Sequence, residues 1–260
     1  MKKEILYVFL VVSSFLLFIP LAEARHLKVY GYGTPGQGEI ELVYWTDYVV
    51  SSDNTMNFFD KTGIDRDGLW SHTFEIEYGV TNRWTISGYA DFEQPSGEDF
   101  KYIQWRAVVA RYRFFEKGER FLDPAIYIEY YLPDPGFLGE AKEKIEFRVI
   151  LEKNLGLTTL TLNPIFEKVL SGADVEEGLE FEYGASIYYK LDSMIRSGLE
   201  FFGKMGEFVN LKSLDDQTHY IVPAFKIGVT EHISWNVGAA FGLTDASDDM
   251  VIKSIIGWEY

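Results

Sequence analysis

The chain has 260 residues, of which 47% are hydrophobic and 17% aromatic, and its formal net charge is −16. This acidic balance argues against nucleic acid as a partner, because the phosphates would be repelled. The absence of cysteine excludes disulfides, thiolate metal sites and lipidation at an N-terminal cysteine.

The N-terminus has the features of a secretory signal peptide. Lys2 and Lys3 precede an apolar run over residues 5–21, and Ala22 and Ala24 are the small residues that a signal peptidase recognises. We therefore expect residues 1–24 to be removed on export. An uncleaved membrane anchor is the alternative, since the apolar run is nearly long enough to span a bilayer.

Residues 25–38 are rich in glycine, and we expect them to form a periplasmic lead-in before the first strand. Alternation of apolar and polar residues begins at Glu39 and continues to the C-terminus. It covers residues 39–49, 69–78, 84–92, 102–114, 125–132, 145–152, 157–166, 179–191, 196–202, 219–229, 234–241 and 250–260. The sequence therefore predicts an all-β chain of about twelve strands, with ten or fourteen as alternatives. Because proline removes a ladder hydrogen bond, we expect bulges or shifted strand ends at Pro164 and Pro223.

The connections between these segments alternate in length. Short turns at 79–83, 153–156, 192–195 and 230–233 interleave with polar loops at 51–68, 133–144, 203–218 and 242–249. Short periplasmic turns and longer external loops are typical of outer-membrane barrels. Two connections do not fit, because 116–124 is long for a turn and 93–99 is short for a loop. Residues 39–260 are nevertheless expected to form a transmembrane antiparallel up-and-down β-barrel.

Aromatic residues gather near the expected strand ends, where a membrane-interface girdle would place them. The candidates are Trp70, Tyr78, Trp84, Trp235, Trp258 and Tyr260. The last ten residues, from Val251 to Tyr260, resemble the closing strand of bacterial outer-membrane β-barrels. That resemblance implies pairing with the first strand and recognition by the barrel-insertion machinery. The edge strand of a soluble β-domain is the alternative.

If the apolar face meets lipid, the other face lines a lumen crowded with charge. The lumen and selectivity candidates are Glu39, Glu41, Glu75, Glu77, Arg106, Glu129, Arg148, Glu180, Glu182, Arg196, Glu200, Lys253 and Glu259. Carboxylates outnumber cations among them, so a ring that favours cations is one expectation. The other is that these carboxylates pair with arginine and lysine across the lumen and only hold the barrel's shape.

No catalytic, cofactor or metal pattern emerges from the sequence. Ser71 and His72 are adjacent, but strand parity points them to opposite faces, so they cannot share a proton. The histidines lack metal-ligand spacing. We therefore expect no catalytic residues, no metal and no cofactor.

Two stretches resemble a family of proposed outer-membrane transporters associated with aromatic (phenol meta-pathway) degradation. They are GQGEIELVYW at residues 36–45 and HTFEIEYGVTNRWTISGY at residues 72–89. The matching positions are Glu39, Glu41, Glu75, Glu77, Tyr78, Gly79, Thr81 and Arg83. The resemblance covers about the first third of the chain. It implies a barrel in the outer membrane, and it transfers no substrate and no catalytic residue.

These features predict an outer-membrane channel, in contact with outer-membrane lipid, that passes small polar or cationic solutes passively through a narrow charged lumen. The alternative is a closed structural or partner-binding barrel whose salt-bridged lumen does not conduct.

Overall fold

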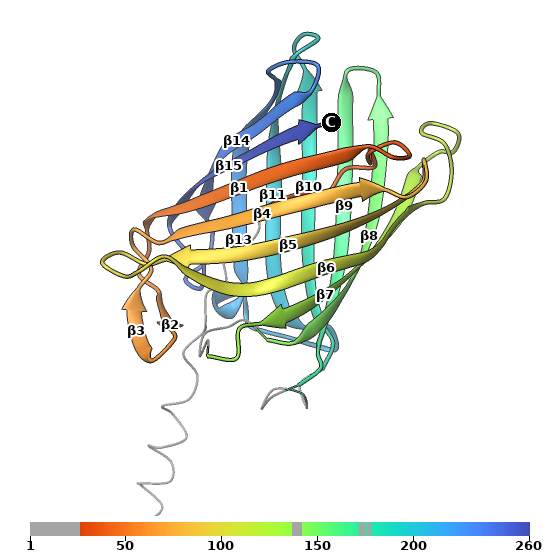
Figure 1. Ribbon diagram of the computed structural model, residues 1–260. Helices are drawn as coiled ribbons and strands as arrows, with labels where there is room; N and C mark the ends of the chain where they lie inside the picture. Colours follow the sequence, from red (N-terminus) through yellow and green to blue (C-terminus); the bar gives the residue numbers. More distant parts are fainter. Residues whose placement is uncertain (1–26, 137–141, 172–174, 176–177) are drawn as a thin grey trace, which may run out of the picture.

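The computed structural model describes residues 27–136, 142–171, 175 and 178–260. Twelve long strands form an antiparallel sheet that closes into a barrel (Figure 1). They are β1 (Ile40–Ser51), β4 (Trp70–Gly79), β5 (Trp84–Gln94), β6 (Lys101–Arg113), β7 (Asp123–Pro133), β8 (Lys144–Leu155), β9 (Thr158–Val169), β10 (Glu180–Lys190), β11 (Ile195–Glu207), β13 (Thr218–Gly228), β14 (Ile233–Gly242) and β15 (Met250–Glu259). No helix among the described residues has the length and hydrophobicity of a membrane span.

The twelve strands confirm the predicted barrel and its up-and-down order. Each strand pairs with its neighbours in sequence, and the ring closes where β15 pairs with β1. Two backbone hydrogen bonds between Ile40 and Tyr260, of 3.1 and 2.8 Å, extend this closing ladder. The final strand therefore pairs with the first, as expected.

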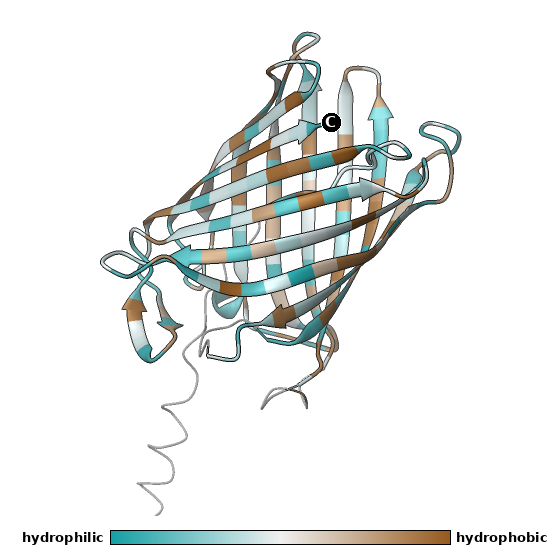
Figure 2. Cartoon of the chain, in the orientation of Figure 1, coloured by the Kyte–Doolittle hydropathy of each residue, from teal (hydrophilic) through white to brown (hydrophobic). Residues whose placement is uncertain are grey.

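The barrel is apolar outside and charged inside. Glu75 and Glu77 on β4 are only 3% and 1% exposed, whereas Phe74 and Ile76, which alternate with them, are 51% and 47% exposed. Figure 2 shows the resulting alternation of hydrophilic and hydrophobic residues along the strands. Because a soluble protein would bury its apolar face, this arrangement is that of a barrel surrounded by lipid.

The two ends of the barrel differ in their connections. Residues 80–83, 156–157, 191–194 and 229–232 form short turns at the end that also carries the C-terminus, called here the short-turn end (Figure 1). The opposite end, called the long-loop end, carries most of the longer connections. The two exceptions lie where the strand order requires them, with 114–122 at the short-turn end and 95–100 at the long-loop end.

Bulges or shifted strand ends were predicted at the two prolines, and no bulge forms at either one. The register of β8 with β9 is the same on both sides of Pro164, and that of β13 with β14 is the same on both sides of Pro223. In each case the pairing is instead interrupted beside the proline, between Ile165 and Leu162 and between Ile221 and Ala224. A gap in one ladder thus accommodates the missing N–H group.

The loop predicted at 51–68 contains a hairpin of β2 (Thr55–Phe58) and β3 (Lys61–Asp65). Met56 and Phe58 are 2% and 1% exposed, because they pack inward at the long-loop end, in a cluster that includes Val49. A 2.5 Å ion pair joins Lys61 to Glu98 in the next loop, and this hydrogen bond raises the pKa of Lys61.

The connection between β11 and β13 adds the short strand β12 (Asn210–Leu211), which pairs with β11, and a 3-10 turn η2 (Leu214–Asp216). A buried ion pair joins two other loops at the same end, since Arg66 binds Asp248 through two hydrogen bonds of 2.7 and 3.0 Å. The long-loop end is therefore narrowed by ordered structure.

Candidate functional site in the barrel lumen

Residues 27–33, which belong to the expected lead-in, lie inside the barrel. Leu27, Val29, Tyr30 and Tyr32 are at most 6% exposed, and none of them belongs to a strand. Every long strand already pairs on both sides. Since buried backbone groups need partners, this segment must take them from side chains that project into the lumen.

The segment is fastened to several strands at once. The side-chain amide of Asn163 on β9 donates to the carbonyl oxygen of Tyr30 at 3.0 Å and accepts from its backbone N–H at 2.8 Å. Arg111 on β6 donates to the carbonyl oxygens of Gly31 and Gly33, at 2.8 and 2.6 Å. The structure thus holds the segment across the lumen with side-chain hydrogen bonds.

Gly79 lets the chain at Gly36, just after this segment, approach the β4–β5 turn. A Cβ atom at Gly79 would lie 1.9 Å from the carbonyl oxygen of Gly36, which no side chain permits. The backbone N–H of Gly38 donates to the carbonyl of Gly79 at 2.8 Å. Gly79 belongs to the motif that carries the family resemblance, and its role here is close contact between two backbones.

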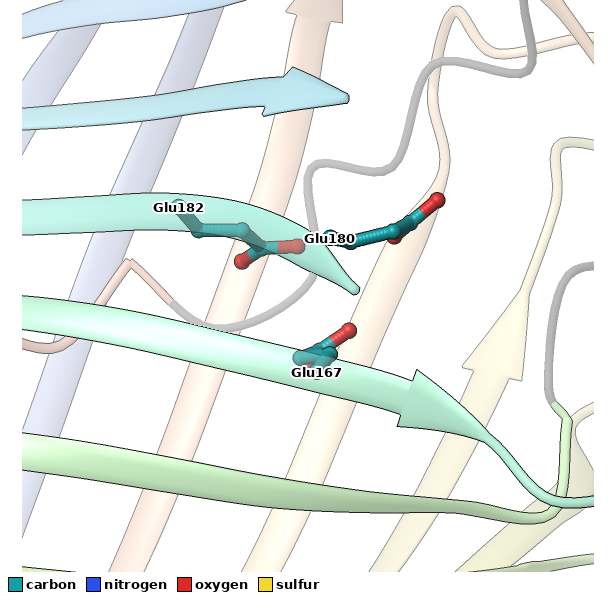
Figure 3. A group of neighbouring side chains, drawn as sticks. All are labelled: Glu167, Glu180 and Glu182. Atoms are coloured by element: carbon teal, nitrogen blue, oxygen red, sulfur yellow. The ribbon is translucent and has the colours of Figure 1, made fainter. Parts of the chain in front are cut away.

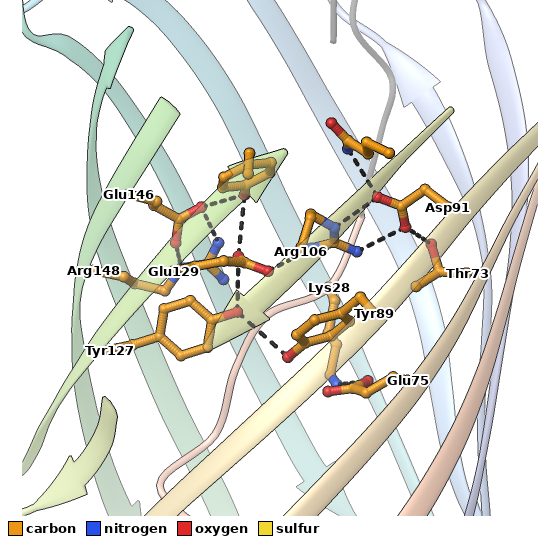
Figure 4. A network of polar contacts seen from close by, with 12 residues as sticks. Lys28, Thr73, Glu75, Tyr89, Asp91, Arg106, Tyr127, Glu129, Glu146 and Arg148 are labelled. Atoms are coloured by element: carbon orange, nitrogen blue, oxygen red, sulfur yellow. Dashed lines mark hydrogen bonds and ion pairs between the residues drawn. The ribbon is translucent and has the colours of Figure 1, made fainter. Parts of the chain in front are cut away.

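A dense polar network covers the lumen wall formed by β4 to β8 (Figure 4). Arg106 binds Asp91 through two hydrogen bonds of 2.7 and 3.0 Å and also donates to Glu129 at 2.9 Å. Thr73 and Gln104 complete the hydrogen bonding of Asp91, at 2.6 and 2.8 Å. Arg106 is 1% exposed, so its charge is neutralised within the wall.

The network continues toward β8. The hydroxyl of Tyr131 lies 3.1 Å from Glu129 and 2.9 Å from Glu146, while Arg148 binds Glu146 through two hydrogen bonds of 2.8 and 3.1 Å. Lys28 from the inner segment adds an ion pair of 2.9 Å to Glu75, which also accepts from the indole N–H of Trp45 at 2.8 Å. Ion pairs and tyrosine hydroxyl groups therefore cover the inner surface of this wall.

The opposite wall has a smaller network around Glu200. Lys253 on β15 forms an ion pair with Glu200 and donates to the carbonyl oxygen of Leu27 at 2.6 Å. The hydroxyl of Tyr188 also donates to Glu200, at 2.5 Å. Lys253 therefore connects the wall to the inner segment.

The lumen candidates from the sequence fall into two groups. Six form ion pairs with other lumen residues: Glu75, Glu77, Glu129, Glu182, Glu200 and Glu180. Of the cations, Arg106, Arg148 and Lys253 are paired, whereas Arg196 forms no ion pair with any residue that the structure describes.

Glu41 lies directly across from Glu77 and from Glu259, so strand closure brings these carboxylates together as expected. Glu39 accepts a 2.5 Å hydrogen bond from the backbone of Gly36.

Three glutamates gather where β9 and β10 approach the long-loop end (Figure 3). Oxygen atoms of Glu167, Glu180 and Glu182 all lie within 4.8 Å of one another, close enough to hold a metal ion. Lys144 binds Glu167 at 2.7 Å, and Lys204 lies 3.1 Å from Glu182. These ammonium groups already supply positive charge, so the cluster fits an internal ion-pair network better than a metal centre.

Two cavities lie in the lumen, and Lys28 lines both. The smaller, of about 80 Å³, faces the long-loop half and is bordered by Tyr131, Glu146 and Lys204. The larger, of about 410 Å³, faces the short-turn half and reaches the exposed turn residue Met194. The inner segment, residues 27–33, thus lies between two open spaces of the lumen.

Several lumen residues were missed from the sequence. Lys28 lies in the lead-in, whose place relative to the lumen the sequence left open. Arg111 was not recognised because bulges in β6 disturb the simple parity there. Trp45 and Tyr127 are at most 2% exposed and face inward although they are aromatic. Their alternation with outward-facing residues was the signal that could have found them.

The six candidate interface aromatics all lie on the outer surface. Their exposed fractions range from 36% for Trp235 to 84% for Tyr260. Trp70 begins β4 at the long-loop end, and the others lie toward the short-turn end. His72 stays on this outer face, 2.8 Å from the Tyr44 hydroxyl, as parity predicted. The membrane-interface role of the six residues remains a prediction.

The closed barrel with its outward apolar face defines the fold class, which is that of transmembrane outer-membrane β-barrels. Among solved structures, the COG4313 outer membrane channel from Pseudomonas putida F1 is similar with a TM-score of 0.61 and 14% identity, over 90% of this chain and 100% of that one. The KdgM porin has a TM-score of 0.54 and 10% identity, over 85% and 98% of the two chains. The NanC porin has a TM-score of 0.53 and 7% identity, over 84% and 97%.

No protein-family model matches the chain, and no curated protein matches it in sequence. The structural neighbours are outer-membrane channels and porins, and at these identities the likeness concerns the fold. The association with aromatic degradation remains a prediction.

Proposed function

We propose that this protein is an outer-membrane channel through which small polar solutes pass passively. The observation that carries the proposal is the enclosed charged lumen, with a cavity on each side of Lys28, inside a barrel whose outer face is apolar. The fold shared with outer-membrane channels and porins supports it. In this proposal residues 1–24 direct export and residues 251–260 are read by the insertion machinery.

The short-turn end then faces the periplasm, in keeping with the connection lengths of outer-membrane barrels. The cation preference expected from the carboxylate count is not retained, because most lumen carboxylates are neutralised by arginine or lysine side chains. Catalysis forms no part of the proposal, since His72 contacts Tyr44 on the outer face, away from the lumen.

The rival is a closed barrel that serves a structural or partner-binding role. It is favoured by the inner segment 27–33 and by Met56 and Phe58, which occupy part of the long-loop end. In the rival the paired charges only stabilise the barrel. Substituting Glu75 and Glu77 would then lower stability without any change in ion selectivity.

Purified protein in a planar lipid bilayer distinguishes the two. The channel predicts a small ohmic current that rises in proportion to voltage, and detergent alone provides the control. A properly folded barrel that passes no current under any voltage or salt condition would reject the channel and leave the closed barrel.

A further inference from the structure

The larger lumen cavity is lined by an excess of positive charge. Its cations are Lys28, Arg111, Arg196, Lys226 and Lys253, and its carboxylates are Glu41, Glu77 and Glu200. Lys28, Arg111 and Lys253 each form an ion pair with a buried glutamate. The charged groups of the lining that remain are Arg196, Lys226 and Glu41, which leave this space with a net positive charge.

Arg196 and Lys226 lie directly across from each other in the sheet. The register pairs Arg196 on β11 with Lys226 on β13, and Lys190 on β10 pairs with Arg196 on the other side. None of these three residues forms an ion pair within the described part of the chain. The Nζ atom of Lys226 lies 4.4 Å from the centre of the Tyr188 ring.

A row of like charges on adjacent strands is costly. Cations directly opposite one another destabilise a sheet, and this holds here although Arg196 is exposed and Lys226 is half-buried. The rest of the lumen shows how this chain avoids that cost, since Arg106 and Arg148 are each bound to a carboxylate through two hydrogen bonds. A ligand that supplies negative charge would relieve the repulsion at the Arg196–Lys226 pair.

We propose that the cavity is a binding site for small organic anions, with their carboxylate held by Arg196 and Lys226. This inference rests on the proposed channel and names its substrate class. The guanidinium group matches a carboxylate through two parallel hydrogen bonds, and lysine adds a mobile point charge. The cavity is also lined by Val43, Ile227 and Ile255, which can contact the apolar body of such a solute.

Glu41 moderates the affinity of this site. Its carboxylate lines the same cavity and forms no ion pair with another described residue. A channel site must attract its solute enough to admit it and bind it weakly enough to release it. An anion would therefore be attracted by Arg196 and Lys226 and repelled by Glu41 as it moves through the cavity.

The test compares the unmodified protein with the double variant Arg196→Gln/Lys226→Gln in planar bilayers. In a KCl gradient, the unmodified channel should pass chloride several-fold more readily than potassium, and sodium butyrate should reduce the chloride current. The double variant should lose both effects. The matched control is Lys153→Gln/Lys212→Gln, which removes two positive charges from positions that do not line the cavity. It should behave like the unmodified protein.

The outcomes separate the site from the channel. A channel that conducts without anion preference, or a double variant that keeps it, overturns the anion site and leaves the channel intact. The absence of current rejects the channel. In that case, calorimetric titration of the detergent-solubilised protein with butyrate tests the anion site independently of conduction. Binding must be present in the unmodified protein and lost in the double variant. Heat-modifiable mobility on gels verifies that each variant is folded.

Discussion

At the scale of single residues, charged side chains that line the lumen form hydrogen bonds and ion pairs with other side chains in place of water. Arg106 illustrates the rule, since Asp91 and Glu129 occupy three of its N–H groups and almost none of its surface is exposed. Forming such a buried ion pair carries a large desolvation penalty. Removing one partner is nevertheless strongly destabilising, because it leaves an uncompensated buried charge.

Replacing Arg106 by methionine is expected to lower the free energy of unfolding by about 3–5 kcal/mol, because two buried carboxylates lose their partner. Urea unfolding in lipid vesicles, followed by tryptophan fluorescence, measures the loss. The matched control is Arg83→Met, whose ion pair with Glu116 lies at the surface of the β4–β5 turn. Its effect should be much smaller, and equal losses in both variants would contradict the assignment.

At the scale of elements, the inner segment and the strands are held in place by different kinds of hydrogen bond. The strands are held by ladders on both sides, whereas residues 27–33 depend on a few side chains, among them Asn163 and Arg111. An element with few hydrogen bonds opens more readily than the sheet around it. We therefore expect this segment to open more readily than the strands around it.

Asn163→Ala is expected to loosen this segment. The substitution leaves the buried N–H and C=O groups of Tyr30 without partners, at a cost of about 1–3 kcal/mol for each group. Amide hydrogen exchange of residues 27–33 should accelerate, and the single-channel current should rise. Asn154→Ala provides the control, because the Asn154 side chain accepts a hydrogen bond from Thr159 beside the β8–β9 turn, far along the chain from residues 27–33. Unchanged exchange in Asn163→Ala would show that the segment does not rely on this contact.

At the scale of the whole molecule, the barrel inverts the usual distribution of polarity. Leu162, near the middle of β9, is 44% exposed, while its neighbours Thr161 and Asn163 are at most 7% exposed. This pattern is stable only if the outer face contacts hydrocarbon, since in water the same face would favour aggregation.

Leu162→Arg is therefore expected to reduce stability in a bilayer by about 2–4 kcal/mol, the range for arginine at the membrane midplane. Val209→Arg serves as control, because Val209 lies in the tight β11–β12 turn and is 85% exposed. Reversible urea unfolding in vesicles compares the two. A negligible effect of Leu162→Arg would mean that this face does not contact lipid.

The sequence by itself predicted about twelve strands, their order and the face that most strand residues occupy. These properties follow from alternation with a period of two and from the lengths of the connections, both of which are local. Glu75 and Phe74 were assigned to opposite faces correctly for this reason. The C-terminal strand was likewise paired with the first strand correctly.

Only the tertiary structure decided how the lumen is filled. Whether Glu75 would meet Lys28, whether Phe58 would fold inward and whether Arg196 would be left without a carboxylate all depend on distances across a closed barrel. Alternation along one strand carries no information about what lies on the far wall. The charges of the lumen could therefore be predicted from the sequence, and their pairing could not.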